Sequence, residues 1–516
     1  MKKIYALLAG AALLLASLAA NAQDATVRVH DDGTGVTIPA AIYGQFSEHL
    51  GRCIYGGLWV GKDSNVPNIE GYRKDVFEAL KTLKVPVMRW PGGCFADDYH
   101  WMDGIGPLEQ RTKISNNNWG GTLEDNSFGT HEFLNLCEML GIEPYISGNV
   151  GSGSVEEMAK WVEYMTAPAG STVANMRVAN GRQEPWKVKY FGIGNEAWGC
   201  GGNMTAPYYS DTYRRYSTYL RDQPGNRLYK IASGASDYDY NWTETLMKQV
   251  GDKMNGVSLH YYSVLNWDDK GSSTGFDEKG YYTILSKTLD IDNVLKRHIE
   301  IMDQYDPDNK VDLLLDEWGT WYNVEPGTNP GHLYQQNTMR DAIVAALNFD
   351  VFHKYTKRLK MCNIAQVVNV LQSMILTNDT DMVLTPTYHV FEMYNVHQDA
   401  EYLATDISTP LVKGPFKGVP VPVVDATASR KDGKMHIDLV NTDLKKTKTV
   451  LVEFDNEKAI KKVKSARILT SAKVQDYNDF DNKNQVAPKA FKDYKVVKGG
   501  IEVTLPPCCI VAFEAE

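Results

Sequence analysis

Two glutamates, each placed directly after an apolar run, have the setting that best suits acid–base and nucleophilic chemistry. The runs are Gly194-Asn195-Glu196-Ala197-Trp198 and Leu313-Leu314-Leu315-Asp316-Glu317-Trp318-Gly319. Two carboxylates that face each other across a gap of about 5–5.5 Å can cleave a glycosidic bond with retention, and a gap of about 6.5–9.5 Å gives inversion. Each motif alone also fits a helix N-terminus with an acidic first turn, or a charged surface loop. Their joint occurrence favours the catalytic interpretation.

The elements that must position these glutamates repeat one theme from residue 40 to about 400. Short apolar runs end in Gly, Asn, Glu or His, and a helical pattern follows each. The predicted strands are 41–46, 85–90, 142–147, 188–193, 228–233, 256–261, 311–316 and 365–371, and the predicted helices include 73–83, 130–140, 155–165, 208–222, 290–304 and 335–355. Such alternation implies parallel strands joined by right-handed crossovers. Eight units predict an α/β fold, a (β/α)8 TIM barrel, with Glu196 and Glu317 at the carboxyl ends of the fourth and seventh strands.

Beyond residue 400 the pattern changes to short strands with alternating polarity. The predicted strands are 436–440, 449–454, 466–470, 494–497 and 501–505, separated by turns rich in Lys, Asp, Asn and Gly. This spacing is typical of a β-sandwich. The run 26–30 also alternates and can add a strand to the same sandwich. We therefore divide the chain into a signal peptide (1–22), N-terminal strands that join the sandwich (23–39), a catalytic barrel (40–400) and a C-terminal β-sandwich (401–516).

The first 22 residues have the layout of a secretory signal peptide. Lys2 and Lys3 precede an apolar run over 4–19, and Ala20-Asn21-Ala22 supplies small residues for cleavage. The run is shorter than the ~20 residues that usually span a bilayer. We therefore expect a periplasmic or secreted protein with no membrane association after removal of the signal.

Charge and cysteine spacing exclude several other classes of function. The formal net charge of −10 disfavours nucleic acid as a partner. The seven cysteines form no C-x-x-C pair and no H-E-x-x-H occurs, so a zinc site lacks its usual spacing. Because two carboxylates suffice for the chemistry, we expect no cofactor and no catalytic metal, and a structural ion is left open. One or two disulfides remain open, and Cys508-Cys509 are expected to be buried. Gly192-x-Gly194-x-x-Ala197 is a weak match to a dinucleotide-binding fingerprint, because further glycines follow where a helix should open.

Six motifs carry a resemblance to the α-L-arabinofuranosidases of glycoside hydrolase family 51, over essentially the whole mature sequence. They are Gly44-Gln45-Phe46-Ser47-Glu48-His49, Arg89-Trp90-Pro91-Gly92-Gly93-Cys94-Phe95, Gly192-Ile193-Gly194-Asn195-Glu196, Leu259-His260-Tyr261-Tyr262, Asp316-Glu317-Trp318 and Asn369-Val370-Leu371-Gln372. The resemblance implies that Glu196 is the general acid/base and Glu317 the nucleophile of a retaining enzyme. It also implies a substrate-binding furanose pocket formed by Glu48, Arg89, Gly93, Cys94, Asn195, His260, Tyr262 and Gln372. Members of such a family are often homo-oligomers.

The residue types support these roles, although several have structural alternatives. Donors such as Arg89 and Tyr262 would keep Glu317 ionised. Asn195 could bond the sugar 2-hydroxyl, where contacts strengthen in the transition state. The alternatives left open are an ion pair of Glu48 with Arg52 or Arg89, a core amide bonded to backbone for Gln372, a core histidine for His260, a small wall residue for Cys94, and ordinary packing for Trp59, Trp119, Trp267 and Trp321 in place of a rim that stacks on sugars.

We thus expect an exported exo-glycosidase that releases terminal non-reducing α-L-arabinofuranosyl residues from arabinan- or arabinoxylan-type plant polysaccharides or their oligosaccharides. An endo-acting glucanase or xylanase on the same barrel would need an open cleft in place of a closed pocket. A non-catalytic carbohydrate-binding protein would keep the aromatic residues but would not need both carboxylates. An aryl arabinofuranoside, tested against an aryl glucoside or xyloside, separates these alternatives.

Overall fold

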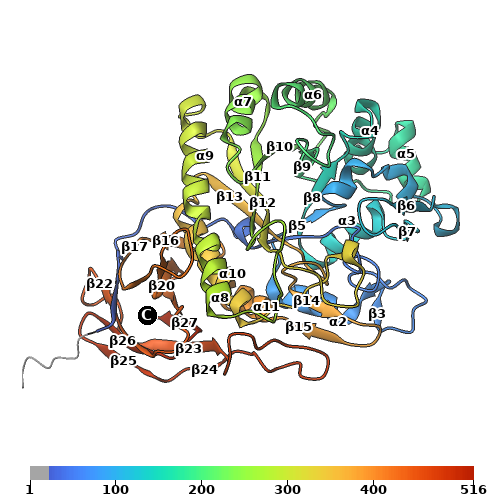
Figure 1. The fold of residues 1–516 in the computed structure, drawn as a ribbon. Coiled ribbons are helices and arrows are strands. Elements are labelled where there is room, and N and C mark those ends of the chain that lie inside the picture. Colours follow the sequence, from blue (N-terminus) through green and yellow to red (C-terminus); the bar gives the residue numbers. More distant parts are fainter. Residues whose placement is uncertain (1–22) are drawn as a thin grey trace, which may run out of the picture.

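A closed parallel barrel forms the centre of the computed structural model, which describes residues 23–516 (Figure 1). The predicted signal peptide lies outside these residues. In barrel order from β2, the strands are β2 (Gly44–Phe46), β5 (Val87–Trp90), β8 (Glu143–Gly148), β9 (Tyr190–Ile193), β10 (Tyr229–Ser236), β11 (Gly256–Ser263), β12 (Asp312–Thr320) and β13 (Leu359–Ala365). Each strand pairs in parallel with its neighbours, which confirms the predicted TIM barrel.

Helices cover the outside of the barrel (Figure 1). They are α2 (Lys74–Leu83), α3 (Thr130–Leu140), α4 (Val155–Thr166), α5 (Thr172–Ala179), α6 (Ala206–Tyr219), α7 (Tyr240–Val250), α8 (Glu278–Leu289), α9 (Ile291–Tyr305), α10 (Met339–Lys354) and α11 (Pro386–Tyr394). Local capping sets several of the boundaries. The Ser154 hydroxyl accepts from the Glu157 amide at 3.1 Å to begin α4, and Gly141 ends α3 in the left-handed conformation. No helix within residues 23–516 has the length and apolar character needed to cross a membrane.

The eighth barrel strand differs from the prediction, because β13 ends at Ala365, where the predicted strand begins. Both runs contain two polar residues, Lys360 and Asn363 in β13 against Gln366 and Asn369 in the run 365–371, but the second run has three valines, which favour a strand. Asn369 and Leu371 nevertheless adopt positive φ angles of 60° and 51°, which is incompatible with an extended strand. The polar residues that follow this strand are therefore displaced along the chain relative to the prediction.

Two antiparallel-rich sheets form the second layer of the molecule. One contains β17 (Thr405–Ser408), β1 (Ala25–Val29), β22 (Lys448–Phe454), β26 (Gly500–Leu505) and β25 (Tyr494–Val497). The other contains β16 (Glu401–Leu403), β20 (Val424–Lys431), β21 (Lys434–Asn441), β27 (Cys509–Ala515), β23 (Val463–Thr470) and β24 (Lys489–Ala490). As predicted, the N-terminal strand joins the C-terminal domain: β1 pairs with β22 in parallel, and Figure 1 shows the blue segment running into the red sheet.

Helix α10 connects the two layers. Every residue from Met339 to His353 is buried, since the helix packs on β12 and on the sandwich strands β20, β21 and β27. Four short hairpins decorate the loops: β3 (Asn68–Ile69) with β4 (Tyr72–Arg73), β6 (Ile114–Asn116) with β7 (Thr122–Glu124), β14 (Ile375–Thr377) with β15 (Met382–Leu384), and β18 (Leu411–Val412) with β19 (Val421–Pro422). The first three follow β2, β5 and β13, so they surround the carboxyl end of the barrel.

Candidate active site

The two glutamates predicted from the sequence meet at the carboxyl end of the barrel. One carboxylate oxygen of Glu196, one of Glu317 and a ring nitrogen of His260 all lie within 4.8 Å of one another. Glu317 is buried within β12, and Glu196 is half-buried immediately after β9. Glu196 has a left-handed φ of 40°, a strained conformation for a non-glycine residue and one that clusters at functional sites. The barrel therefore holds the carboxylates of Glu196 and Glu317 close enough to act on one bond.

Glu317 receives two charge-assisted hydrogen bonds. Arg89 Nη1 donates to Oε1 at 2.8 Å and the Tyr262 hydroxyl donates to Oε2 at 2.7 Å. Arg89 is itself buried, and it also donates to Asn195 Oδ1 at 2.5 Å. Although burial opposes its charge, Asp316 and Glu317 raise the pKa of Arg89 above its ordinary value. These donors hold both carboxylate oxygens of Glu317 in place.

The imidazole of His260 contacts the carboxylates of Glu196, Glu317 and Asp316. Its Nδ1 lies 2.7 Å from Glu196 Oε1 and 3.5 Å from Glu317 Oε2, and its Nε2 lies 3.1 Å from Asp316 Oδ1. Burial disfavours the imidazolium, but Glu317, Asp316 and Glu196 together raise the pKa of His260 to about 10. Burial likewise raises the pKa of Asp316, yet Arg89 and His260 outweigh it and lower that pKa overall. His260 is therefore a buried cation that donates from both nitrogens.

Glu48 lines the same cavity as Glu196 and Glu317. Its Oε1 accepts from the amides of Gly93 and Phe95 and from Trp119 Nε1, at 2.9, 3.1 and 2.9 Å, and its Oε2 accepts from Gln366 Nε2 at 3.0 Å. Burial and the charge of Glu317 raise the pKa of Glu48 to about 7 despite these donors. The predicted alternative, an ion pair with Arg52 or Arg89, is not formed in the structure.

Gly93 shows why glycines occur in this wall. A Cβ atom at Gly93 would lie 2.9 Å from Glu317 Oε1, and one at Gly92 would lie 2.8 Å from Glu48 Cγ. Only a residue without a side chain allows the backbone to approach both carboxylates this closely.

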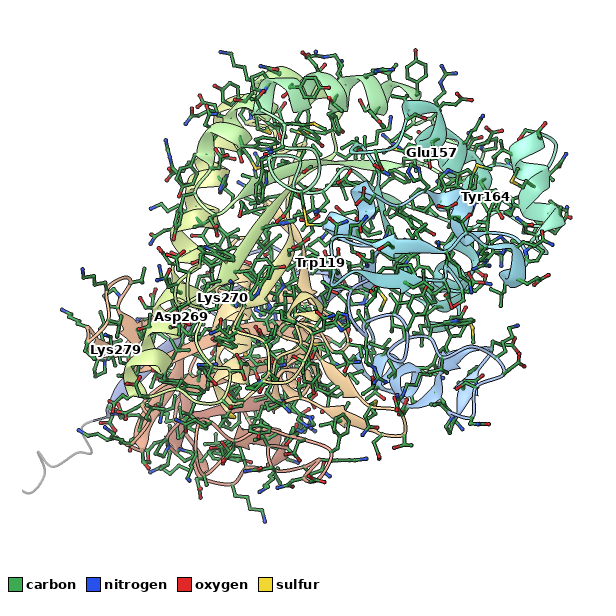
Figure 2. The ribbon with its side chains drawn as sticks, turned by 45° about the vertical axis from the view of Figure 1, so that its right-hand side comes forward. Trp119, Glu157, Tyr164, Asp269, Lys270 and Lys279 are labelled. Atoms are coloured by element: carbon green, nitrogen blue, oxygen red, sulfur yellow. A yellow bond between two sulfur atoms is a disulfide. The ribbon has the colours of Figure 1, made fainter. Side chains whose placement is uncertain are left out.

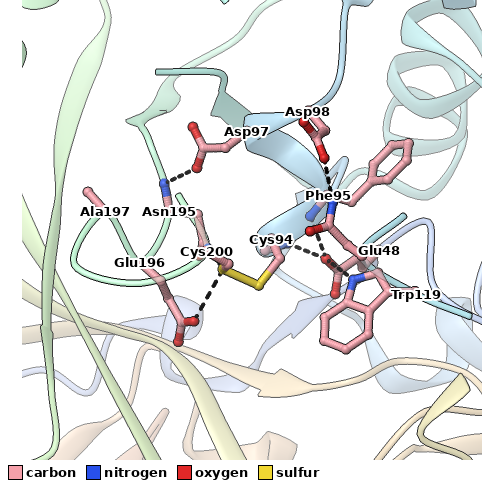
Figure 3. The surroundings of a disulfide bond; sticks show 12 residues. Glu48, Cys94, Phe95, Asp97, Asp98, Trp119, Asn195, Glu196, Ala197 and Cys200 are labelled. Carbon is pink, nitrogen blue, oxygen red and sulfur yellow. Dashed lines mark hydrogen bonds between the residues drawn. A yellow bond between two sulfur atoms is a disulfide. The ribbon is translucent and has the colours of Figure 1, made fainter. Parts of the chain in front are cut away.

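A disulfide joins the loops that carry Glu48's donors and Glu196 (Figure 3). Cys94 and Cys200 have Cα atoms 5.4 Å apart, and Cys200 Sγ lies 3.6 Å from Glu196 Oε2. Cys94 lines the cavity, as predicted for a small wall residue. The other five cysteines, Cys508 and Cys509 among them, are free and buried. Asp97 supports the same loop, because its Oδ2 accepts from the Asn195 amide at 2.9 Å.

The enclosed cavity between these walls measures about 50 Å³. Its lining consists of Phe46, Glu48, Leu50, Gly93, Cys94, Trp119, Asn195, Glu196, Tyr262, Glu317, Trp321, Leu333, Gln366 and Leu371. Trp267 lies at the outer edge, 52 % exposed, with its ring centre 5.6 Å from that of Trp321. The Lys270 ammonium lies over the indole rings of Trp267 and Trp321. Figure 2 labels Lys270 and Trp119. Trp59, by contrast, packs in the core.

Three residues predicted to contact substrate lie behind the cavity wall. The nitrogens of Arg89 and His260 are taken by the carboxylates and by Asn195. Gln372 is a core amide: its Oε1 accepts from the Thr320 amide at 2.9 Å and its Nε2 donates to the Asp341 carbonyl at 2.8 Å. Gln366, which directly follows β13, occupies the place predicted for Gln372. The prediction for Gln372 is therefore corrected, and its structural alternative holds.

Within residues 23–516, two groups of side chains have the spacing of a metal site. In the first, Glu196, His260 and Glu317, both ring nitrogens of His260 already lie within hydrogen-bond distance of carboxylates, those of Glu196 and Asp316. In the second, Cys94, Glu196 and Cys200, the two sulfurs are bonded to each other, so neither is a free thiolate ligand.

The chain matches known proteins along most of its length. Residues 79–278 match the family model described as alpha-L-arabinofuranosidase 1 domain, and residues 316–509 match that of the alpha-L-arabinofuranosidase C-terminal domain. A Bacteroides ovatus protein described as an intracellular exo-alpha-L-arabinofuranosidase is 61 % identical over 99 % of both chains.

Two crystal structures agree with this assignment. The GH51 arabinofuranosidase of Xanthomonas axonopodis pv. citri superposes with a TM-score of 0.93 at 48 % identity, over 96 % of this chain and 100 % of that one. The Thermotoga maritima alpha-L-arabinofuranosidase in its arabinose complex superposes with a TM-score of 0.83 at 31 % identity, over 95 % and 99 %. With the paired carboxylates at the end of its barrel, this chain belongs to the α-L-arabinofuranosidases of glycoside hydrolase family 51.

Proposed function

We propose that the protein is a retaining exo-α-L-arabinofuranosidase that releases terminal arabinofuranosyl residues from arabinan- or arabinoxylan-type polysaccharides and their oligosaccharides. The observation that carries this proposal is the separation of the two carboxylates. Oxygens of Glu196 and Glu317 lie within 4.8 Å of each other, which leaves no room for the water that an inverting pair places between them.

In the first step Glu317 is the nucleophile. Its carboxylate oxygen forms a bond to the anomeric carbon while the bond from that carbon to the leaving-group oxygen breaks. Glu196 transfers its proton to this oxygen, so the leaving group departs as an alcohol. Arg89 and Tyr262 stabilise the Glu317 carboxylate until it attacks. Asn195, which lines the cavity and is fixed by Arg89 and Asp97, is the donor for the 2-hydroxyl.

In the second step the ester is hydrolysed. Water attacks the anomeric carbon, its proton passes to Glu196, and Glu317 is released as a carboxylate. His260 keeps its own protons throughout and orients both glutamates, because Asp316 stabilises the imidazolium. Two displacements at one carbon restore the original anomeric configuration.

The shape of the cavity supports exo action. The cavity is small, about 50 Å³, whereas an endo-acting enzyme needs a cleft that admits a chain on both sides of the cut. Glu48 and Gln366 close the inner end, where they suit the distal hydroxyls of a terminal furanose.

Export is supported by two features. The residues before Gln23 have the signal-peptide pattern, and the Cys94–Cys200 disulfide suits an oxidising compartment. The Bacteroides ovatus relative is described as intracellular, which is a statement about that protein. Cell fractionation with mass determination of the mature N-terminus tests export: an intact Met1 in the cytoplasm would exclude it.

NMR observation of the first sugar released from an aryl α-L-arabinofuranoside tests substrate and stereochemistry together. The expected first product is the α-anomer of arabinose, which later mutarotates. Initial release of the β-anomer would exclude the double displacement. Faster cleavage of an aryl xyloside or glucoside would instead favour the alternative activity.

A further inference from the structure

The Cys94–Cys200 disulfide lies against the proposed acid/base. Cys200 Sγ is 3.6 Å from Glu196 Oε2, and Figure 3 shows the Glu196 carboxylate pointing toward the bond. One carboxylate oxygen of Glu196 and both sulfurs lie within 4.8 Å of one another. Neither sulfur takes part in the double displacement, so the chemistry of this group of three side chains is not explained by that reaction.

Backbone hydrogen bonds hold Cys200 in its turn independently of the disulfide. The Glu196 carbonyl accepts from the amides of Gly199 and Gly201, at 2.7 and 3.2 Å. The Gly199 carbonyl accepts in turn from the Asn203 amide at 2.8 Å, so the turn is closed on both sides of Cys200. Because Glu196 and Cys200 belong to one compact turn, we expect them to stay adjacent when the S–S bond is absent.

The loop that carries Cys94 has anchors of its own. The amides of the residues on either side of Cys94 donate to Glu48 Oε1 at 2.9 and 3.1 Å. Asp97, three residues further on, joins this loop to the other one, because its carboxylate accepts from the Asn195 amide at 2.9 Å. After reduction we therefore expect the two cysteine Cα atoms to keep about their present separation of 5.4 Å.

Two thiolates at this spacing form a ligand pair for a thiophilic metal ion. A zinc–sulfur bond is about 2.3 Å long, so two thiolates on one ion lie within about 4.6 Å of each other, which cysteines with Cα atoms 5.4 Å apart can satisfy. Glu196 supplies a carboxylate oxygen as a third ligand. Three protein ligands leave a fourth position for water, and the two thiolates favour Zn²⁺ over Mg²⁺ or Ca²⁺.

These two sulfurs are accessible from solvent, in contrast to the remaining cysteines. Cys200 is exposed and Cys94 is half-buried, so a reductant and a metal ion can reach them. The other five cysteines are free and buried. Burial raises the pKa of the Cys53 and Cys508 thiols to about 12, so they form little thiolate at neutral pH. A thiophilic ion added to the reduced protein should therefore bind at Cys94 and Cys200.

We propose that reduction of the disulfide creates a Zn²⁺ site formed by Cys94, Cys200 and Glu196, and that the bound ion stops turnover. When a phosphine breaks the S–S bond, water supplies the oxygen of the phosphine oxide and one proton to each sulfur. Zn²⁺ then displaces the two thiol protons. Glu196 bound to the ion can neither protonate the leaving group nor accept a proton from water, a consequence that rests on the proposed function. The intact disulfide thus protects the acid/base from metal ions.

Titration of the reduced protein with Cd²⁺ tests the site without reference to activity. The whole protein is reduced with a water-soluble phosphine, freed of it in the absence of air, and titrated with Cd²⁺, whose bonds to thiolates absorb ultraviolet light. We expect one Cd²⁺ to bind per chain with this absorption. The oxidised wild type and the reduced Cys94→Ser/Cys200→Ser variant should show none. Reduced Cys137→Ser, the matched control that removes a buried thiol, should bind Cd²⁺ like the wild type.

Inhibition by Zn²⁺ tests the consequence for catalysis. With p-nitrophenyl α-L-arabinofuranoside, a slight excess of Zn²⁺ should lower kcat of the reduced wild type about tenfold or more, since general acid–base catalysis contributes about 10²–10⁴-fold. A chelator should restore the rate. The oxidised wild type, and the reduced double variant relative to its own rate without metal, should change less than twofold.

The inference is overturned if the reduced wild type binds no Cd²⁺ through sulfur, if circular dichroism shows that reduction alone unfolds the protein, or if Zn²⁺ inhibits the oxidised enzyme as strongly as the reduced one. Binding through sulfur without loss of activity would refute the role of Glu196 as a ligand. If the double variant does not fold, the oxidised wild type serves as the control. A wild-type protein that cleaves no arabinofuranoside would refute the proposed function, while the Cd²⁺ absorption would still decide the metal site.

Discussion

The two ends of the barrel carry similar groups with opposite electrostatic consequences. At each end a tyrosine donates to a carboxylate: Tyr262 to Glu317 at 2.7 Å at the carboxyl end, and Tyr229 to Asp312 at 2.5 Å at the amino end. The amino end also has the larger cavity, about 380 Å³ against about 50 Å³. The size of a cavity therefore does not identify the active site.

The difference lies in what burial does to the charges. At the amino end burial raises the pKa of Asp312 and lowers the pKa of Lys360, so both groups shift toward their neutral forms. At the carboxyl end partner charges outweigh burial for two groups, which lowers the pKa of Asp316 and raises that of His260, while burial still raises the pKa of Glu48 to about 7. Charges that stabilise one another out of water are available to a reaction.

Replacing one carboxylate at each end gives the largest expected contrast. Glu317→Gln keeps the size of the side chain but removes the nucleophile, and kcat should fall about 10⁴-fold or more. Asp312→Asn makes the same change at the amino end and should leave kcat within twofold. Initial rates on an aryl arabinofuranoside measure both. A Glu317→Gln enzyme within tenfold of wild type would reject the assigned nucleophile.

The disulfide provides a contrast in stability. Cys94–Cys200 closes a loop of 106 residues, so loss of the bond should lower the free energy of unfolding by about 2–4 kcal/mol. Denaturant titration of the Cys94→Ser/Cys200→Ser double variant measures this loss. A reductant should lower the stability of the wild type but not of the double variant, because the remaining cysteines are free thiols and the variant has no Cys94–Cys200 bond to reduce. Equal sensitivity of both proteins would show that the bond does not form in solution.

The same contrast explains what the sequence could predict. Periodicity located seven barrel strands and the ends that carry Glu196 and Glu317, since strand ends in a parallel barrel converge. The eighth strand was placed wrongly because β13 and the run after it contain equal numbers of polar residues, and the second run is richer in valine although it forms a loop. The assignment of the pocket amide to Gln372 came from the family resemblance, whereas Gln366 follows the true strand end.

Other features depend on distances between loops that no sequence pattern encodes. The pairing of Cys94 with Cys200 is of this kind, since the loops after β5 and β9 meet only in the closed barrel. The hydrogen bonds of Arg89 and His260 to other side chains of the protein also depend on distances between loops. The family resemblance implied sugar contacts for both, yet neither lines the cavity, and both bond to the carboxylates, as the residue type of Arg89 had suggested.

Removing Asp316 should change the response to pH at the carboxyl end. In the wild type His260 stays protonated up to a pKa of about 10. Asp316→Asn removes one supporting charge, so the alkaline limb of kcat/KM should move down by one to two pH units, which is a ten- to hundredfold loss at an intermediate pH. Chemical shifts of the imidazole nitrogens report the same pKa directly. An unchanged limb would mean that His260 protonation does not limit activity.

The raised pKa of His260 also determines how the free energy of unfolding changes with pH. Because the pKa of His260 is raised above its ordinary 6.5 in the folded state, its contribution to stability is complete below pH 6.5 and is lost as the pH rises toward 10. The free energy of unfolding of the wild type should therefore decline over this range, and Asp316→Asn should decline less steeply.

The smallest effects are expected from the most closely matched pair of substitutions. Tyr→Phe at each end of the barrel removes one hydroxyl from a tyrosine–carboxylate pair. Tyr262→Phe deprives Glu317 of a charge-assisted hydrogen bond, and kcat should fall about tenfold because the nucleophile is less well oriented and less stabilised. Tyr229→Phe removes the bond to Asp312, and only the free energy of unfolding should change, by about 1 kcal/mol. Rate measurements and denaturant titrations on both variants separate the outcomes. If Tyr229→Phe slowed turnover as much as Tyr262→Phe, the amino end would be coupled to catalysis and the distinction between the two ends would fail.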